Sequence, residues 1–228
     1  MSDALDFSEY NQKCSYCLKE VGKDNLRSCR CRYARYCSRQ CQTNAWPTHK
    51  AACSTDKSLK YKLDQPGNKE SKKLHDHFTK WLNYYRDTIC TRAISAFNLP
   101  NSPTNKLATH CMYLVVEQQP EAKDIPFYFR MVSGQVISRR KMIDTFNNLK
   151  KGMTEEEVDS WARDNRGEHT LHVVIQFEDM IRFLWFSLRD LSSYRVIDSA
   201  KANRRAGMWA NALASAIDDG RAGPDRDD

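Results

Sequence analysis

The sequence predicts an α+β protein, with a small cysteine-rich segment near the N-terminus and a larger domain of helices and paired strands after it. Three observations lead to this prediction. Cysteines crowd residues 14–53, one apolar stripe at helical spacing runs through residues 74–99, and the apolar spacing becomes that of strands after Pro103. Strand pairs and helices in this order favour an α+β domain, with helices on one face of a mostly antiparallel sheet.

The cysteine-rich segment contains eight residues that can ligate a metal. They are Cys14, Cys17, Cys29, Cys31, Cys37, Cys41, His49 and Cys53. Zinc in structural sites takes four thiolate or imidazole ligands in a tetrahedron, so eight ligands are enough for two zinc ions. Two cysteines separated by two or three residues can place both sulfurs on one tight turn. The spacing therefore predicts two zinc ions in this segment.

Disulfides and a RING finger are the alternatives. The N-terminus, MSDALDFSEY, is polar and acidic and does not resemble a signal peptide, so the oxidising compartment that would favour disulfides is not indicated. A RING finger also interleaves two zinc ions, but its central ligands are spaced differently and it lacks the closing His-x3-Cys. The lack of a signal peptide is consistent with the expected location, intracellular in the nucleus or cytoplasm. No apolar run reaches the length of a membrane span, so no membrane partner is expected.

The residues between the ligands add a family resemblance. The string RYCSRQCQTNAWPTHKAAC closely resembles the MYND zinc finger family, in which the first and third ligand pairs hold one zinc and the second and fourth pairs hold the other. The resemblance implies Cys14, Cys17, Cys37 and Cys41 for the first zinc, and Cys29, Cys31, His49 and Cys53 for the second. The family's second pair is usually C-x2-C, whereas only Arg30 separates Cys29 from Cys31 here.

The MYND resemblance also implies a function in protein binding. Members of the family bind short proline-rich peptides, which lie along the finger as an added strand. Their contact residues include the Gln and Trp of a C-Q-x3-W motif, and these positions are Gln42 and Trp46 here. Packing between two short helices is the alternative role for Trp46, because a small metal-held domain needs apolar filler. The resemblance therefore predicts a zinc-dependent adaptor or scaffold whose partner carries a proline-rich segment.

Two short helices are expected within the finger. Ser38 is a candidate N-cap for a helix through Gln42. Pro47 suits the first turn of a second helix. On that helix His49 and Cys53 are four residues apart, so both can point at one metal.

The composition divides the chain into five parts. They are an N-terminal tail (1–13), the finger (14–53), a linker (54–73), an α+β domain of unknown function (74–217) and a polar tail (218–228). The linker prediction rests on its Lys, Asp and Ser content and on a Gln-Pro-Gly-Asn turn. The finger is too short to bury a core of its own and depends on metal, whereas the α+β domain is long enough to fold without it.

Helical and strand patterns alternate through the α+β domain. Helices are expected at 74–99, 139–150, from Thr154 through Trp161, and at 200–217; strands are expected at 109–118, 126–136, 171–177 and 180–188. The string FTKWLNYYRD…THCMYLVVEQQP…FLWFSL in this domain is also similar to the C-terminal part of MYND proteins from filamentous and mushroom-forming fungi.

The net charge of +7 raises the question of nucleic-acid binding. Seven thiolates (−7) and two Zn²⁺ ions (+4) would change it by −3, which leaves about +4. Four arginines, Arg30, Arg32, Arg35 and Arg39, lie between the ligands and can offset the anionic zinc–thiolate centres. Because the chain has no recognition-helix or RNA-binding signature, nucleic acid is not the expected partner. A transcriptional regulator with nucleic-acid contact stays as an alternative.

The sequence further predicts that the chain is not an enzyme and has no catalytic residues. Some MYND proteins carry a SET methyltransferase domain split around the finger, but only thirteen residues precede Cys14 and the SET motifs are absent. Glycine-rich phosphate loops and the nucleophile elbow are absent too. His110 and Cys111 are adjacent in a predicted strand and so point to opposite faces. An enzyme with an unrecognised site in the α+β domain stays as an alternative.

Overall fold

The computed structural model describes residues 14–17, 19–29, 34–46, 49–50, 53, 64–65, 67–99, 101, 106–148, 170–178, 180–187 and 199–223. The chain divides into two compact units, one made of Met1–Thr79 with Arg226–Asp228 and the other of Lys80–Asp225. None of the helices in the described part of the chain combines the length and hydropathy needed to span a bilayer.

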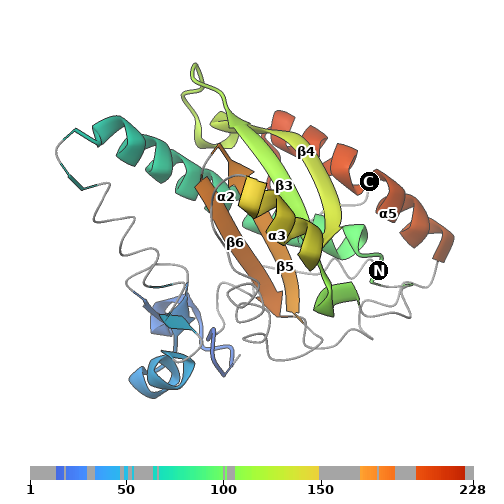
Figure 1. Ribbon diagram of the computed structural model, residues 1–228. Coiled ribbons are helices and arrows are strands. Elements are labelled where there is room, and N and C mark those ends of the chain that lie inside the picture. The colour runs from blue at the N-terminus through green and yellow to red at the C-terminus, as the bar shows by residue number, and fades with distance from the viewer. Residues whose placement is uncertain are drawn as a thin grey trace. The chain divides into compact units, whose positions relative to one another are not determined.

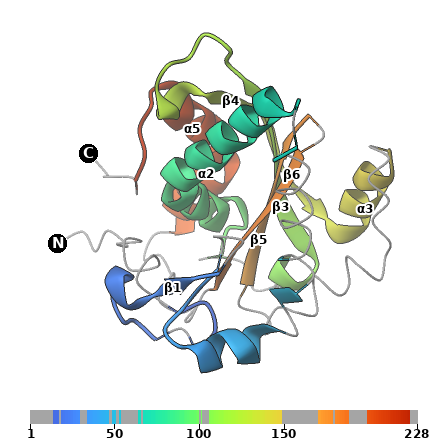
Figure 2. The same ribbon diagram turned by 90° about the vertical axis from the view of Figure 1, so that its left-hand side faces the viewer.

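A small antiparallel hairpin organises the first unit. Strands β1 (Arg27–Ser28) and β2 (Arg35–Tyr36) pair antiparallel and follow η2 (Lys23–Asn25); β1 is labelled in Figure 2. Residues 39–46 are helical, and the backbone N–H of Cys41 donates to Ser38 Oγ at 3.1 Å. Ser38 therefore caps this helix, as the sequence predicts. The predicted start of the second short helix at Pro47 lies outside the described residues.

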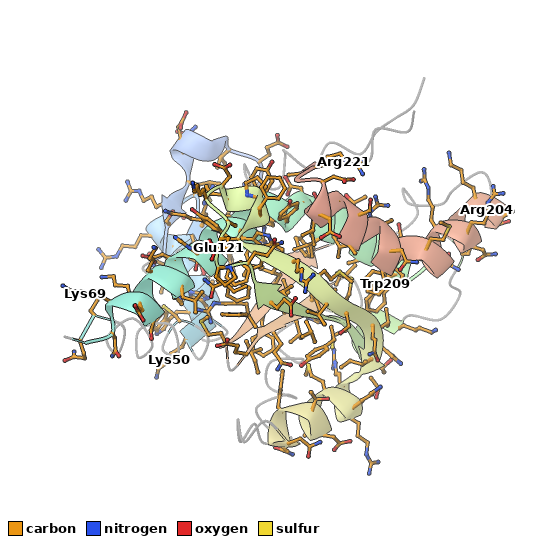
Figure 3. The ribbon with its side chains drawn as sticks, turned by 90° about the horizontal axis from the view of Figure 1, so that it is seen from above. Lys50, Lys69, Glu121, Arg204, Trp209 and Arg221 are labelled. Atoms are coloured by element: carbon orange, nitrogen blue, oxygen red, sulfur yellow. The ribbon has the colours of Figure 1, made fainter. Side chains whose placement is uncertain are left out.

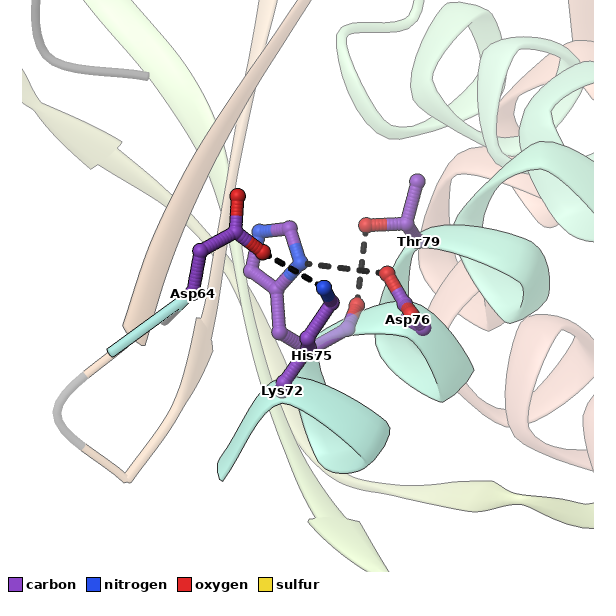
Figure 4. Close-up of polar contacts among 5 residues, drawn as sticks. All are labelled: Asp64, Lys72, His75, Asp76 and Thr79. Atoms are coloured by element: carbon purple, nitrogen blue, oxygen red, sulfur yellow. Dashed lines mark hydrogen bonds and ion pairs between the residues drawn. The ribbon is translucent and has the colours of Figure 1, made fainter. Parts of the chain in front are cut away.

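The long helix α2 (Lys69–Ala96) begins at Lys69 rather than at Leu74, so the last residues of the predicted linker are helical. The backbone N–H of Lys72 donates to the carbonyl of Asn68 at 2.9 Å, and its ammonium pairs with Asp64. Figure 4 shows this pair beside His75 and Thr79 in the first turns of the helix. Lysine and glutamate are good helix formers, so a polar first turn is compatible with helix even where no apolar stripe marks it.

The end of α2 comes three residues before the predicted one, because Asn98 adopts a left-handed backbone conformation with φ +49°. The Asn98 N–H donates to the Ser95 carbonyl, and the Leu99 N–H donates to the Ile94 carbonyl. These two bonds are those of a Schellman motif, which satisfies the last carbonyls of the helix. Asparagine tolerates this conformation better than most residues, so the sequence stops the helix before Pro100.

The second unit is built on a four-stranded mixed sheet. Its strands are β3 (His110–Gln118), β4 (Phe129–Ser138), β5 (Thr170–Phe177) and β6 (Met180–Ser187), in the order β4-β3-β5-β6. The pairs β3–β4 and β5–β6 are antiparallel, whereas β3 and β5 are parallel. Parallel neighbours need a crossover connection, and helix α3 (Arg139–Asn148) lies in the stretch between β4 and β5.

The predicted α+β class is confirmed, but its helices cover both faces of the sheet rather than one. Figures 1 and 2 show α2 and α5 (Ser199–Asp218) on one face and α3 on the other. On the α3 side, Met142 and Phe146 pack with Cys111 and Tyr113 of β3. Side chains of a strand alternate between faces, and β3 is buried along nearly its whole length, as a strand covered on both sides must be.

Helix α5 packs closely over β4 because that strand has a glycine beneath it. A Cβ placed on Gly134 would lie 2.7 Å from Cη2 of Trp209 and 3.1 Å from Cδ2 of Leu114. The ring of Trp209, labelled in Figure 3, therefore occupies space that any other residue at 134 would fill. The ladder between β3 and β4 also shifts register between Val115 and Val116, which leaves Val132 as a bulge residue.

The described strands agree with the predicted ones to within three residues at each end. Helices α3 and α5 likewise match the predicted helices at 139–150 and 200–217. The helix predicted from Thr154 through Trp161 lies outside the described residues. The five-part division of the chain stays a prediction.

Candidate metal centre

Cysteines make up half of the buried residues in the small core of the finger. The buried residues of its core are Cys14, Cys29, Ala34, Tyr36, Ala45 and Cys53. Cys17, Cys37 and Cys41 pack against them with their side chains partly buried. Half of the buried set can ligate a metal, and the large apolar side chains of this core are few: Tyr36 is buried, and Tyr16 and Leu26 are partly buried. Apolar burial alone is therefore a weak source of stability for this unit.

The first ligand cluster joins two cysteines that precede the hairpin in the chain with two that follow it. The sulfur atoms of Cys14, Cys17, Cys37 and Cys41 all lie within 4.8 Å of one another. Backbone bonds hold the two chain segments together, because the Ser15 N–H donates to the Arg35 carbonyl at 2.8 Å and the Arg35 N–H donates to Ser15 Oγ at 3.0 Å.

The second cluster brings together Cys29, His49 and Cys53, whose ligand atoms also lie within 4.8 Å of one another. The Sγ atoms of Cys29 and Cys53 are 3.7 Å apart, and Nε2 of His49 is 3.3 Å from Sγ of Cys29. Cys31, the fourth ligand that the family resemblance implies, lies outside the described residues. The pairs thus cluster in the interleaved order, first with third and second with fourth.

The distances suit zinc and do not suit disulfides. The Sγ of Cys37 is 3.6 Å from that of Cys17 and 3.5 Å from that of Cys41. A disulfide would need about 2.05 Å, and all eight described cysteines are free thiols. Zinc–sulfur bonds of about 2.3 Å in a tetrahedron place neighbouring sulfurs roughly 3.8 Å apart. The donor sets, four sulfurs in one cluster and sulfur with imidazole in the other, fit the same metal.

The pKa values of the thiols indicate that the first cluster cannot hold all of its cysteines as thiolates without a cation. Burial raises the pKa of Cys14, but hydrogen bonds from backbone amides outweigh it and lower the value to about 7. Hydrogen bonds with Cys41 and Cys17 raise the pKa of Cys37 to about 12. Several thiolates cannot share one small volume, so some protons are retained. A dication at the centre would stabilise all four thiolates together.

Two aromatic side chains hold the imidazole of His49. The ring of Tyr36, buried in the core, lies 6.2 Å from it, and the ring of Trp46 lies 6.3 Å from it, both in edge-on arrangements. Burial lowers the pKa of His49, which favours the neutral form that binds metal. Tyr36 is a supporting residue that sequence reasoning did not assign, although its position beside Cys37 was a usable signal.

Comparison with known proteins identifies the segment. The family model of the MYND finger matches residues 14–53, which begin at Cys14 and end at Cys53. This segment is a MYND finger. It is a zinc-binding protein-interaction domain, and the predicted zinc cofactor is confirmed with it.

The MYND finger is also the part of the chain that curated relatives share. Histone-lysine N-methyltransferase SMYD3 is 50% identical over 48 residues in both Mus musculus and Homo sapiens, and N-lysine methyltransferase SMYD2 of Homo sapiens is 41% identical over 51 residues. These matches cover 21–22% of this chain and 11% of each relative, so the chain spans a small part of the relatives it matches. No solved structure matches the chain.

These relatives correct one prediction. The sequence predicted that the chain is not an enzyme, and that prediction is contradicted because all three relatives are methyltransferases. The missing SET motifs were a poor basis for excluding activity, since known motifs do not exhaust the ways in which a site can be built.

The two residues predicted to contact a peptide lie on the helix that follows Ser38. Gln42 and Trp46 are four residues apart within the helical stretch 39–46, so their side chains project from the same helix face. The Gln42 side chain is partly exposed, and Trp46 is 40% exposed. Trp46 contacts His49 by its edge and keeps 40% of its surface exposed, so part of the side chain packs against the finger while the rest is open to a ligand.

Proposed function

We propose that this chain is a zinc-dependent adaptor whose MYND finger docks a proline-rich segment of a partner protein at Gln42 and Trp46. The observation that carries the proposal is the placement of these two side chains, four residues apart with Gln42 partly exposed and Trp46 exposed, on a helix that carries a ligand of the first cluster. One large exposed aromatic ring beside one amide is a common arrangement for proline recognition, because the ring packs on proline and the amide pairs with main-chain groups.

The proposed zinc ligands are Cys14, Cys17, Cys37 and Cys41 for one ion and Cys29, Cys31, His49 and Cys53 for the other. When bound, the two ions supply the cross-links that the small core of the finger lacks. The helix carrying Gln42 and Trp46 starts beside Cys37 and includes Cys41, and the chain returns to the second cluster at His49. Both ends of the proposed docking surface are therefore anchored, which lowers the ordering cost of binding.

The test is capture of proline-rich peptides by the zinc-loaded full chain. Trp46→Ala is expected to weaken binding of a labelled proline-rich peptide by more than about tenfold, and Gln42→Ala by a few fold. Gln40→Ala is a matched control, since Gln40 is an exposed glutamine of the same helix that already bonds to Asn44. Zinc content must stay unchanged in all variants. Normal peptide binding by Trp46→Ala with full zinc content would show that the proposed docking surface is wrong.

A second candidate function is protein lysine methylation. It rests on a single observation, that the three curated relatives with this finger are lysine methyltransferases. The match ends at the finger, so any such activity would belong to residues with no detected likeness to theirs. Incubation of the zinc-loaded chain with labelled S-adenosylmethionine and histones tests it. Transfer of label to lysine supports the candidate, and the absence of both transfer and cofactor binding removes it.

A further inference from the structure

Three of the large apolar side chains that lie exposed on the protein gather at one place on the second unit. The described residues contain six such side chains: Trp46, Tyr84, Ile125, Phe127, Val132 and Met208. Tyr84 belongs to α2, whereas Ile125 and Phe127 belong to η4 (Ile125–Phe127) in the connection between β3 and β4. We call these three side chains, with Pro126 between them, the η4 patch.

Gly220 connects the parts of this patch. The Tyr84 hydroxyl donates to the Gly220 carbonyl at 3.0 Å, and a Cβ at Gly220 would lie 2.8 Å from Cζ of Phe127 and 3.4 Å from Cβ of Pro126. The rings of Tyr84 and Phe127 therefore flank the same backbone unit. Because Gly220 has φ +67° and no side chain, it can both turn the chain and let the two rings approach.

The backbone beneath the η4 patch is rigidly fixed. Helix α5 ends in a Schellman motif, with the Gly220 N–H donating to Ile217 and the Arg221 N–H donating to Ala216. The Tyr85 hydroxyl lies 3.2 Å from the Pro126 carbonyl and 3.1 Å from the Ile217 carbonyl, so it joins α2, η4 and α5. A surface held in this way loses little entropy when it binds.

Hydrogen bonds also hold the residues that follow α5 against α2. Gly223 exchanges two hydrogen bonds with Thr88, since its N–H donates to Thr88 Oγ1 at 2.9 Å and its carbonyl accepts from that hydroxyl at 3.2 Å. Residues 219–223 therefore lie along α2 and form one border of the η4 patch.

The border of the patch is acidic. The connection from 119 to 128 carries Glu121 and Asp124 against one lysine, and the end of α5 carries Asp218 and Asp219 against Arg221. Arg221 pairs with Asp219 at 2.6 Å, whereas Glu121, Asp124 and Asp218 make no ion pair within the described part of the chain. Figure 3 labels Glu121, in the connection between β3 and β4, and Arg221, which follows α5. The acidic border stands out because the whole chain carries +7.

We propose that the η4 patch docks a basic segment of a partner protein, in which lysine or arginine residues flank an apolar side chain. Unpaired carboxylates around an apolar centre complement such a segment, because charge attracts the flanks while the apolar residue covers Ile125 and Phe127. The faces of Tyr84 and Phe127 also attract cations. This docking surface is separate from the one proposed on the MYND finger and does not depend on it.

The probe for this proposal is a labelled peptide in which lysines flank a central Leu-Phe pair, measured by fluorescence anisotropy with the full-length, zinc-loaded chain. Ile125→Ser is expected to weaken binding by about tenfold, because it removes exposed apolar area without touching a described hydrogen bond. Asp124→Asn combined with Asp218→Asn is expected to weaken binding several fold and to flatten its salt dependence. Met208→Ser removes an exposed apolar side chain elsewhere and is expected to change nothing.

Three results would overturn the proposal. One is equal affinity of Ile125→Ser and the unsubstituted chain, with the fold of both confirmed by circular dichroism. Another is equal affinity for a peptide whose Leu-Phe pair is replaced by Ser-Ser, which would reduce the interaction to charge alone. The third is a dimer in sedimentation analysis that Ile125→Ser converts to monomer, because a second copy of the chain would then occupy the patch.

Discussion

Nε2 of His49 lies 3.3 Å from Sγ of Cys29, although twenty residues separate them in the chain. Between them in sequence lie Cys37 and Cys41, which belong to the other cluster with Cys14 and Cys17. Each cluster therefore closes a loop that contains part of the other. Two interleaved cross-links restrict the unfolded chain more than two consecutive ones would, because each metal-closed loop contains ligands of the other metal.

Loss of one ligand is therefore expected to affect both zinc sites. Cys14→Ser and Cys53→Ser each remove one sulfur from a different cluster. Elemental analysis of the unsubstituted protein is expected to give two zinc ions per chain, and each variant fewer than two. Because the loops interleave, each variant is also expected to lose the protease resistance of the whole finger.

Cys90→Ser provides the control, because this buried thiol lies on α2 and belongs to neither cluster. It should keep both zinc ions. Should either ligand variant lose one ion while the rest of the finger keeps its protease resistance, the two clusters would be independent and the interleaved arrangement would be wrong.

Removal of zinc is expected to unfold the finger and to spare the second unit. The buried residues of the finger core are few, whereas the sheet of the second unit is covered by helices on both faces. After addition of chelator, amide hydrogen exchange of β3 is expected to stay slow while that of residues 34–46 becomes fast. Loss of protection in both regions at the same chelator concentration would mean that the two units fold together.

Patterns in the sequence predicted most elements because each depends on local chemistry. The strand pairs follow from runs of apolar and β-branched residues, and the metal clusters from repeated ligand spacing. The parallel contact between β3 and β5 had no such signal, because it depends on the path of the chain between them. The early start of α2 was missed because the first turn of the helix is polar, and the apolar stripe does not mark it.

In the candidate site, too, features with a local sequence signal were predicted and features that depend on the fold were not. Gln42 and Trp46 came from a motif, and their position on one helix face agrees with it. The position of Tyr36 beside Cys37 was a signal for a supporting role, but its contact with His49 could not be predicted because an aromatic residue next to a ligand has many possible neighbours. The η4 patch was missed for another reason. Its residues come from two segments, α2 and η4, that only the fold brings together, and neither segment marks them by its own pattern.

Gly134→Ala is expected to destabilise the second unit by about 1–3 kcal/mol. The added methyl group would lie 2.7 Å from Cη2 of Trp209 and 2.6 Å from Cε of Met131, so these side chains, or α5 with Trp209, must shift to make room for it. Gly207→Ala is the matched control, because a Cβ there meets nothing within 4 Å and alanine favours helix. Urea unfolding curves measure both variants. A Gly134→Ala variant as stable as the unsubstituted chain would mean that this contact is not tight.

The stability of the second unit is expected to fall as the pH drops below about 6.5, because of His172. This residue is 1% exposed in β5, and burial, aided by the charge of Arg139, lowers its pKa to about 3. In the unfolded chain the imidazole of His172 takes up a proton near its ordinary pKa. In the folded protein the same imidazole stays unprotonated until the pH approaches its lowered pKa. Between the two pKa values the unfolded state therefore binds more protons, and the free energy of unfolding decreases by up to about 1.4 kcal/mol per pH unit.

His172→Gln removes this titration, so the difference in unfolding free energy between pH 7 and pH 4.5 is expected to be smaller in the variant than in the unsubstituted chain. The comparison is made on the urea transition of the second unit, where release of zinc from the finger contributes equally to both proteins. The variant itself is expected to be less stable at pH 7, because the glutamine side chain does not have the shape of the buried imidazole ring that it replaces. The decisive quantity is therefore the change with pH. An identical pH dependence in the two proteins would show that His172 keeps an ordinary pKa despite its burial.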